Sequence, residues 1–360
     1  MARQMQVTAQ DKMSAPLHVV TPMVKSVPLS QWLPGCDVYL KMESSQVSGS
    51  FKMRGIAYRC QKAVQRGSTH LVGASGGNAG LALACAARLL NVPCTVYVPV
   101  TTPQITVNRL KSEGANVVVH GTNFSIANER ALQEAEKPGV SFVHAYNHPE
   151  IWEGHASIMD EAAAQLPSKP SVIVLSVGGG GLMSGVLQGL HNVGWADVPV
   201  VAMETYGAHC FNMSVNAKRV EPLDSITSIA TSLGARTVPD ELMATLSNFN
   251  VTSEVVTDAQ AVSSCLQFAD GEKTVVEPAC GAALAAVYHG VLSRLEQEGH
   301  LDLKSGPVLV VVCGGSVVSL ALLQQWGVKL GVSFPGQHNY KNEVANNSWT
   351  TTVLSSEKCV

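Results

Sequence analysis

The sequence predicts an α/β fold built on parallel β-sheets. Short runs rich in valine alternate with longer stretches of helical periodicity along almost the whole chain, and this order is typical of strand–helix–strand units. The strand runs are continuously apolar rather than alternating, which indicates sheets covered by helices on both faces. Strands are expected at 71–72, 94–98, 116–119, 140–143, 172–177, 198–203 and 308–312.

The segments between these strands show helical spacing of apolar residues. Helices are expected at 51–65, 78–90, 104–112, 126–135, 150–165 and 282–295. Because parallel sheets bind ligands beyond the carboxyl ends of their strands, residues that directly follow a strand are the first candidates for a site. After Gly331 the aliphatic pattern gives way to Asn, Ser and Thr, so we expect a loose tail at 332–360.

Composition limits the classes of partner. The chain has 360 residues, 46% of them hydrophobic and 14% charged, enough for a large core in one or two domains. A formal charge of −3 without a run of Lys and Arg gives no electrostatic basis for binding nucleic acid or an anionic membrane. We expect a small-molecule partner.

Cysteine usage and hydropathy bear on the compartment. The nine cysteines are scattered and form no CxxC pair, which argues against a disulfide framework or a zinc knuckle. The first twenty residues lack the apolar stretch of a secretory signal. The most apolar stretch, 308–323, is broken by Gly314, Gly315 and Ser316, as a buried strand and helix would be. These features predict a cytoplasmic protein without a membrane span.

The first candidate for chemistry is Lys52. It lies at the start of a predicted helix, next to Phe51 and behind a Ser-Gly turn. Partial burial there would lower its pKa and make the free amine available for Schiff-base chemistry, with Phe51 near a planar ring. A solvated surface lysine is the alternative interpretation.

The second candidate is the turn between strand 71–72 and helix 78–90. Its backbone N–H groups suit a carboxylate, and the Asn78 amide suits a phenolic oxygen. The turn consists of Ser75, Gly76, Gly77, Asn78 and Ala79. An ordinary helix cap is one alternative. The run 73–77 also matches the G-x-S-x-G nucleophile elbow of hydrolases, but a hydrolase leaves Lys52 without a role.

The third candidate is a glycine run directly after strand 172–177. Four residues without side chains allow backbone amides to close around a phosphate, although a tight packing turn is an alternative. The run consists of Gly178, Gly179, Gly180, Gly181 and Leu182. It fits neither G-x-G-x-x-G nor the P-loop, which disfavours a dinucleotide or a nucleoside triphosphate.

Cys313 and three histidines complete the candidates. Cys313 ends the last predicted strand and precedes two glycines, but free cysteine is commonly a core residue. His144, His148 and His155 match no metal-binding spacing, so we interpret them as structural.

Together, these segments resemble the serine/threonine dehydratase family of fold-type II pyridoxal 5'-phosphate (PLP) enzymes, especially its animal L-serine dehydratase and serine dehydratase-like branch. The resemblance implies two open, twisted, mostly parallel sheets covered by helices, as in the tryptophan synthase β subunit, and a homodimer. It also implies a small domain at 46–148 and a large PLP-binding domain at 1–45 plus 149–331. Beyond the candidate sites it includes the stretches 39–41, 148–155, 203–205 and 276–281.

The resemblance assigns roles to the candidate residues. Lys52 would hold PLP as a Schiff base, Phe51 would pack on the ring, and Asn78 would bond the phenolic oxygen. The glycine run 178–182 would hold the phosphate, and the turn 75–79 would receive the substrate carboxylate. Cys313 would face the pyridine nitrogen, where a neutral thiol leaves the electron sink moderate and favours β-elimination.

The implied reaction is dehydration and deamination of L-serine to pyruvate and ammonia, and of L-threonine to 2-oxobutanoate and ammonia. Lys52 would take the α-proton, and the cofactor phosphate is a candidate acid for the leaving hydroxyl. Serine racemase is the nearest alternative, but the serine of its loop is replaced here by Gly76, which cannot exchange a proton. Dehydration of another β-hydroxy amino acid and a weakly active binding homologue stay open.

Two positions depart from the family pattern. Val47 stands where relatives usually carry proline, which makes the turn before Lys52 less rigid. The family's site for potassium or sodium maps to backbone at Gly178 and Ala208 and to the side chains of Glu204 and Cys210. A thiol is a poor ligand for a hard cation, so this position weakens the expected monovalent-cation site.

Overall fold

The computed structural model describes residues 15–332 and contains two β-sheets. The six-stranded sheet has the order β1-β2-β10-β7-β8-β9, and the four-stranded sheet has the order β5-β4-β3-β6. Every strand pair is parallel except β1 with β2. The strands are β1 (Met23–Ser26), β2 (Val38–Met42), β3 (His70–Ala74), β4 (Cys94–Val98), β5 (Asn116–Val119), β6 (Val140–Phe142), β7 (Val172–Ser176), β8 (Val200–Thr205), β9 (Val251–Val256) and β10 (Val308–Val312).

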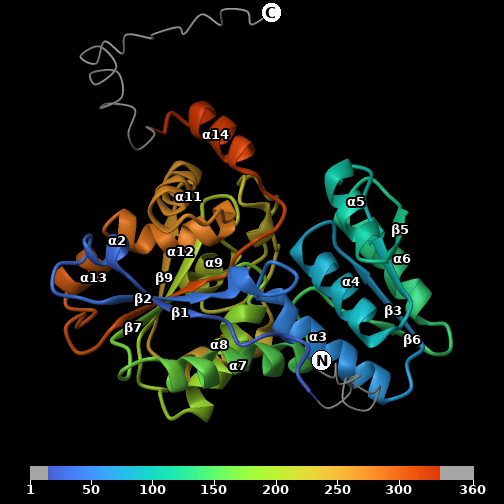
Figure 1. The fold of residues 1–360 in the computed structure, drawn as a ribbon, viewed down its shortest axis with the longest axis horizontal. Helices are drawn as coiled ribbons and strands as arrows, with labels where there is room; N and C mark the ends of the chain where they lie inside the picture. The colour runs from blue at the N-terminus through green and yellow to red at the C-terminus, as the bar shows by residue number, and fades with distance from the viewer. Residues whose placement is uncertain (1–14, 333–360) are drawn as a thin grey trace, which may run out of the picture.

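Helices cover both faces of the sheets, which explains the continuously apolar strands. Leu71 and Val72 are neighbours on β3 and point to opposite faces, yet both are fully buried, in two different apolar clusters. In Figure 1 the small sheet with its helices lies on the right and the large sheet on the left, with α3 between them. The predicted α/β fold with two mostly parallel sheets is therefore confirmed.

Most helices occur where the sequence predicts them. The predicted helix 282–295 is two helices instead, because Gly290 adopts a positive φ of 70° and ends the helical path. Strands β1, β2 and β9 were not predicted. The helices are α2 (Val27–Ser30), α3 (Lys52–Gln65), α4 (Asn78–Leu90), α5 (Gln104–Ser112), α6 (Phe124–Ala135), α7 (Pro149–Gln165), α8 (Gly181–Asn192), α9 (Cys210–Ala217), α10 (Asp240–Thr245), α11 (Asp258–Glu272), α12 (Pro278–Tyr288), α13 (Val291–Gln297) and α14 (Leu320–Lys329), with 3-10 turns at Glu43–Ser45, Thr231–Leu233 and Leu246–Asn248.

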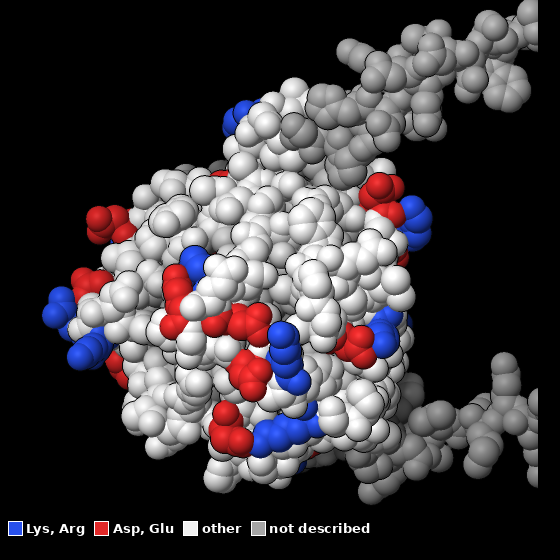
Figure 2. Space-filling model, turned by 90° about the vertical axis from the view of Figure 1, so that its left-hand side faces the viewer, with Lys and Arg blue, Asp and Glu red and all other residues white. Residues whose placement is uncertain are grey.

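Charges of both signs are mixed on the surface. On the face in Figure 2, Lys and Arg lie interspersed with Asp and Glu and form no large patch of one sign. Within residues 15–332 no helix is long and apolar enough to cross a membrane.

Two sequence predictions stay untested by the structure. The expected loose tail lies, apart from Val332, outside the described residues. The domain boundaries at 46 and 148 stay a prediction.

Candidate active site

Lys52 is the first residue of α3, the helix that lies between the two sheets in Figure 1. Its amine points into the protein. Its Nζ donates a hydrogen bond to the backbone oxygen of Ala145 at 2.8 Å. The same nitrogen lies 5.2 Å from the centroid of the Phe51 ring and 6.0 Å from that of Tyr146. Burial lowers the pKa of Lys52 to about 8. A larger share of this amine is therefore neutral at pH 7 than for a surface lysine.

A buried ionic network fixes the helix that carries Lys52. The Arg54 side chain donates to Glu43 through Nε at 2.7 Å and to Glu161 through Nη1 at 2.7 Å. Lys41 Nζ adds a hydrogen bond to Glu161 at 2.5 Å. Ion pairing with the two carboxylates raises the pKa of Arg54 despite burial. These four residues come from β2, the turn after it, α3 and α7, so they join the start of α3 to the large sheet.

All three histidines singled out in the sequence stabilise the backbone. The Nδ1 of His155 accepts from the N–H of Gly55 in the first turn of α3 at 3.2 Å, and its ring lies 5.0 Å from the Phe51 ring. His148 accepts from the first turn of α7, and His144 accepts from Asn147 N–H at 2.8 Å. No cluster of metal-ligating side chains occurs in the described part of the chain.

The turn from β3 to α4 presents free backbone donors. The Ser75 hydroxyl accepts from the N–H of Gly77 at 3.2 Å, and this is its only hydrogen bond among residues 15–332. Over the same residues, the N–H groups of Gly76, Asn78 and Ala79 have no acceptor. The turn therefore has the donors that a carboxylate needs. In the described part of the chain no histidine is hydrogen-bonded to Ser75, as a hydrolase nucleophile would require.

Asn78 is held by a residue that sequence reasoning missed. Its Nδ2 lies 2.9 and 3.1 Å from the two carboxylate oxygens of Glu277, and its Oδ1 accepts from the N–H of Ser316 at 3.0 Å. Glu277 is buried and also accepts from Ser232 and from Val317 N–H. Burial raises the pKa of Glu277. The residue stands directly before Pro278 at the start of α12, inside the stretch 276–281 of the family resemblance, which gave it no role.

The glycine run 178–182 after β7 forms a loop, called the glycine cradle below, whose backbone packs closely against neighbouring residues. A Cβ atom at Gly179 would lie 2.6 Å from the Tyr146 ring, and one at Gly178 would lie 2.9 Å from Leu233. Gly180 has a positive φ of 80°. Among the described residues, the N–H groups of Gly179, Gly180, Gly181 and Leu182 have no acceptor. Such a set of converging amides at a helix start suits a phosphate.

Cys313 lies at the end of β10, beside the segment that carries Lys52. Its backbone oxygen accepts from the N–H of Phe51 at 3.2 Å. The pKa of Cys313 is raised well above the ordinary value, mainly by a hydrogen bond with Cys280 and secondly by burial. The side chain is therefore a neutral thiol at physiological pH.

The residues expected at a cation site also lie together. Cys210 Sγ is 3.6 Å from the backbone oxygen of Gly178. The Glu204 carboxylate is fully buried and accepts from the N–H groups of Phe211 and Asn212 at the start of α9. Burial raises the pKa of Glu204 to about 8. Ala208 follows in the same turn, where its N–H donates to Thr205.

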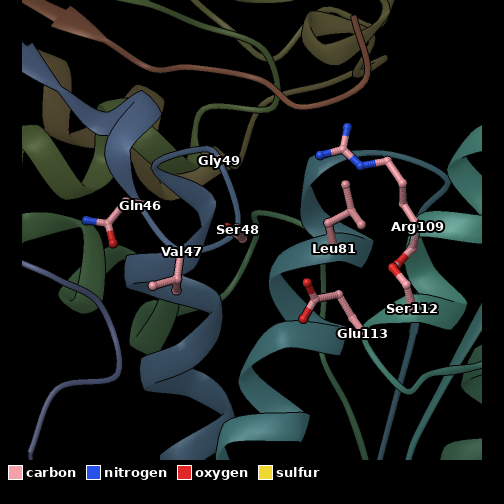
Figure 3. Close-up of a pocket in the computed structure, with 8 residues that line it drawn as sticks. All are labelled: Gln46, Val47, Ser48, Gly49, Leu81, Arg109, Ser112 and Glu113. Atoms are coloured by element: carbon pink, nitrogen blue, oxygen red, sulfur yellow. The ribbon is translucent and has the colours of Figure 1, made fainter.

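A cavity of about 260 Å³ lies between the segment before Lys52 and helices α4 and α5 (Figure 3). Ser48, Gly49 and Leu81 line it, and Arg109 projects over it from α5. The positive charge of Arg109 lowers the pKa of Glu277, although burial outweighs this effect. The charge of Arg109, a residue at this cavity, therefore acts on Glu277, the hydrogen-bond partner of Asn78.

Comparisons with known proteins agree with this geometry. Residues 15–314 match the family model "Pyridoxal-phosphate dependent enzyme". The chain is 49% identical to L-serine dehydratase/L-threonine deaminase of Mus musculus, with 88% of this chain and 97% of the relative covered. It is 47% identical to serine dehydratase-like of Homo sapiens, over 90% and 98% of the two chains. A crystal structure of a fungal L-serine ammonia-lyase from Rhizomucor miehei superposes with a TM-score of 0.81 at 36% identity, over 87% and 99% of the chains.

The local chemistry fits the cofactor of that family. The amides of Gly179 to Leu182 can hold its phosphate, and the half-buried Lys52 places its amine close to Phe51 and Tyr146 with a lowered pKa. Neither feature depends on the comparisons, and both lie inside the matched range 15–314. The chain therefore belongs to the family of pyridoxal-phosphate dependent enzymes.

Proposed function

We propose that this protein is an L-serine and L-threonine ammonia-lyase, with Lys52 holding PLP through a Schiff base. The relatives named above support the substrates. The observation that carries the proposal is the half-buried Lys52, with the pKa of its amine lowered to about 8, together with a cradle of free amides. L-serine would lose water, and hydrolysis of the dehydrated product by another water would release ammonia and pyruvate; L-threonine would give 2-oxobutanoate and ammonia in the same way.

Each side chain has a proposed task in this reaction. PLP, when bound, supplies the electron sink that makes the α-proton of an amino acid acidic. The free amine of Lys52 takes that proton, because its lowered pKa leaves a larger share of it neutral than in an ordinary lysine. The amides of the turn 75–79 hold the substrate carboxylate, and those of Gly179 to Leu182 hold the cofactor phosphate. The Asn78 amide, held by Glu277 and Ser316, would turn to the phenolic oxygen of the ring.

The neutral thiol of Cys313 supports elimination over other outcomes. It is the proposed neighbour of the pyridine nitrogen, and its raised pKa means that it brings no negative charge there. A ring nitrogen without an anionic partner is not driven to hold a proton, which weakens the electron sink. A carbanion formed next to a weak sink loses its β-hydroxyl rather than waiting for reprotonation.

Four further proposals accompany this function. First, a K⁺ or Na⁺ ion would bind at Gly178, Glu204, Ala208 and Cys210. Second, the chain would divide into domains at residues 46 and 148, a division supported by the two separate sheets. The family resemblance implies a homodimer, which light scattering would test. A cytoplasmic location is supported by the unpaired state of the eight described cysteines.

The test uses full-length protein with PLP, given L-serine, L-threonine and D-serine separately. We expect 2-oxo acid and ammonia in equal amounts from the L-substrates, and loss of both activity and the cofactor's visible band in Lys52→Ala. Lys62→Ala, at a position on the same helix that contacts Tyr58, is the matched control and should keep both. A Lys52→Ala enzyme with full turnover would refute the assignment.

A further inference from the structure

Gly76 is in contact with a side chain from a neighbouring strand end. A Cβ atom at Gly76 would lie 2.7 Å from Oγ1 and 2.8 Å from Cγ2 of Thr102. Real Cβ atoms do not approach other atoms so closely. The space that any larger residue at position 76 would use is therefore filled by Thr102, and the turn at Gly76 gains no extra room from the missing side chain.

The parallel sheet explains why these two residues meet. β3 and β4 are adjacent, with Ala74 paired to Tyr97, so both strands end at the same edge of the sheet. Gly76 follows β3 by two residues. Thr102 follows β4 in a turn closed by its N–H on the backbone oxygen of Pro99 at 3.0 Å. The contact is thus built by the register of the sheet rather than by nearby sequence.

Thr102 has a free polar group at this position. Its hydroxyl forms no hydrogen bond with any other described residue, and the side chain is half-buried. The amides of Gly76, Asn78 and Ala79 in the facing turn also have no acceptor among residues 15–332. These two neighbouring turns thus carry four donors that have no acceptor among residues 15–332. Unmatched donors grouped in this way indicate an anionic ligand.

We propose that Thr102 is a substrate-binding residue whose hydroxyl donates a hydrogen bond to the carboxylate of the amino acid. Its methyl group closes the wall that Gly76 leaves open. The inference rests on the proposed function, because it takes the turn 75–79 as the carboxylate site. It adds to that function a side-chain donor that comes from the turn after β4.

The contact itself is tested by thermal unfolding of five variants: three single variants and two double variants that include Thr102→Ala. Gly76→Ala should lower the unfolding midpoint, and adding Thr102→Ala should restore it, because the two Cβ atoms would then lie an acceptable 3.4 Å apart. Gly77→Ala is the matched control, since a Cβ there meets only Ser75 Oγ at 3.9 Å. Thr102→Ala should not rescue it. Additive effects of Gly76→Ala and Thr102→Ala would show that the side chains do not meet.

The hydroxyl is tested by calorimetric titration of the PLP-loaded enzyme with 3-hydroxypropanoate, which has the carboxylate of serine but no amine. Thr102→Val keeps the shape and should weaken binding about tenfold, the usual value of one hydrogen bond to a charged group. Thr102→Ser should bind as the wild type does. The KM for L-serine should rise by a similar factor in Thr102→Val with little change in kcat, while binding of L-serine methyl ester, which lacks the charge, should not change.

The outcomes separate the two proposals. Equal binding of 3-hydroxypropanoate by wild type and Thr102→Val would overturn the role of Thr102, even if the wild type is an active ammonia-lyase. A wild type that forms no 2-oxo acid would overturn the proposed function. In that case the titration still decides whether Thr102 binds a carboxylate.

Discussion

Arg54 and Glu43 form a two-point ion pair from which solvent is excluded. Nε and Nη2 of Arg54 each lie 2.7 Å from one carboxylate oxygen of Glu43, and neither side chain is exposed. Arg54 stands two residues after Lys52, whereas Glu43 belongs to the turn after β2. The pair therefore sets where the Lys52 helix begins relative to the large sheet.

Removing Arg54 should be costly for folding. Arg54→Met leaves the buried Glu43 carboxylate without its cation and Glu161 with Lys41 alone, so we expect the free energy of unfolding to fall by about 3–5 kcal/mol. Denaturant titration of the PLP-loaded protein measures this. Arg66→Met is the control, because Arg66 also makes a two-point pair, with Glu150, but is 54% exposed. Its loss should stay within about 1 kcal/mol; equal losses in both variants would contradict the assignment.

Glu204 should make stability depend on pH and on potassium. Its pKa in the folded protein is about 8, against 4.5 as a model value. A carboxyl whose pKa is raised by folding stabilises the protein fully below the unfolded pKa, and this contribution is lost as pH rises towards the folded pKa. We therefore expect the free energy of unfolding to decrease by several kcal/mol as the pH rises from about 5 to about 8. Glu204→Gln should remove this slope.

The same measurement tests the proposed cation site. A bound K⁺ next to Glu204 would favour the ionised carboxylate and lower its pKa. Potassium should then flatten the decrease in stability towards pH 8, whereas tetramethylammonium of equal ionic strength should not. Identical curves in the two salts would argue against cation binding at Glu204, with no consequence for the cofactor site.

The glycine cradle should discriminate the phosphate of the cofactor. In Gly179→Ala the new methyl group meets the Tyr146 ring at 2.6 Å, so the cradle must open. We expect the affinity for PLP to fall at least tenfold, while the affinity for pyridoxal, which lacks the phosphate, changes little. Visible absorbance titration measures both. Adding Tyr146→Ala should recover part of the PLP affinity, and no recovery would place the defect elsewhere.

Arg109 should shift the titration of Glu277. Glu277 must be ionised to accept both contacts from Asn78, and the charge of Arg109 lowers its pKa. Arg109→Gln removes that charge, so the acid limb of the kcat/KM profile should move to higher pH, and only slightly, because Arg109 is exposed to solvent. Arg109→Lys should leave the limb in place, and added salt should produce the same shift in the wild type. A limb that is identical in all three proteins would exclude this coupling.

Sequence patterns predicted the elements and the anchors of the site. Helices α4 and α5 begin and end at the predicted residues, 78–90 and 104–112. They were predictable because the signals for a helix, its apolar periodicity and the residues that flank its ends, are local in the sequence. The glycine run and Lys52 were found because each has a local signature. Strand β9 was missed because Val251–Val256 carries Thr, Ser and Glu at an edge of the sheet, where one side is half-exposed.

The partners of these anchors could not be predicted in the same way. Asn78 and Glu277 are separated by 199 residues, and Tyr146, Thr102 and the Arg54–Glu43 pair have no motif of their own. The sequence alone determined the fold family, and it singled out Lys52 and the glycine run as candidates, because these features depend on local propensity and on glycines that directly follow a strand. Only the tertiary structure decided which side chains hold Asn78, cover the cradle and stand beside Gly76, because parallel register and packing join strand ends that are distant in the chain.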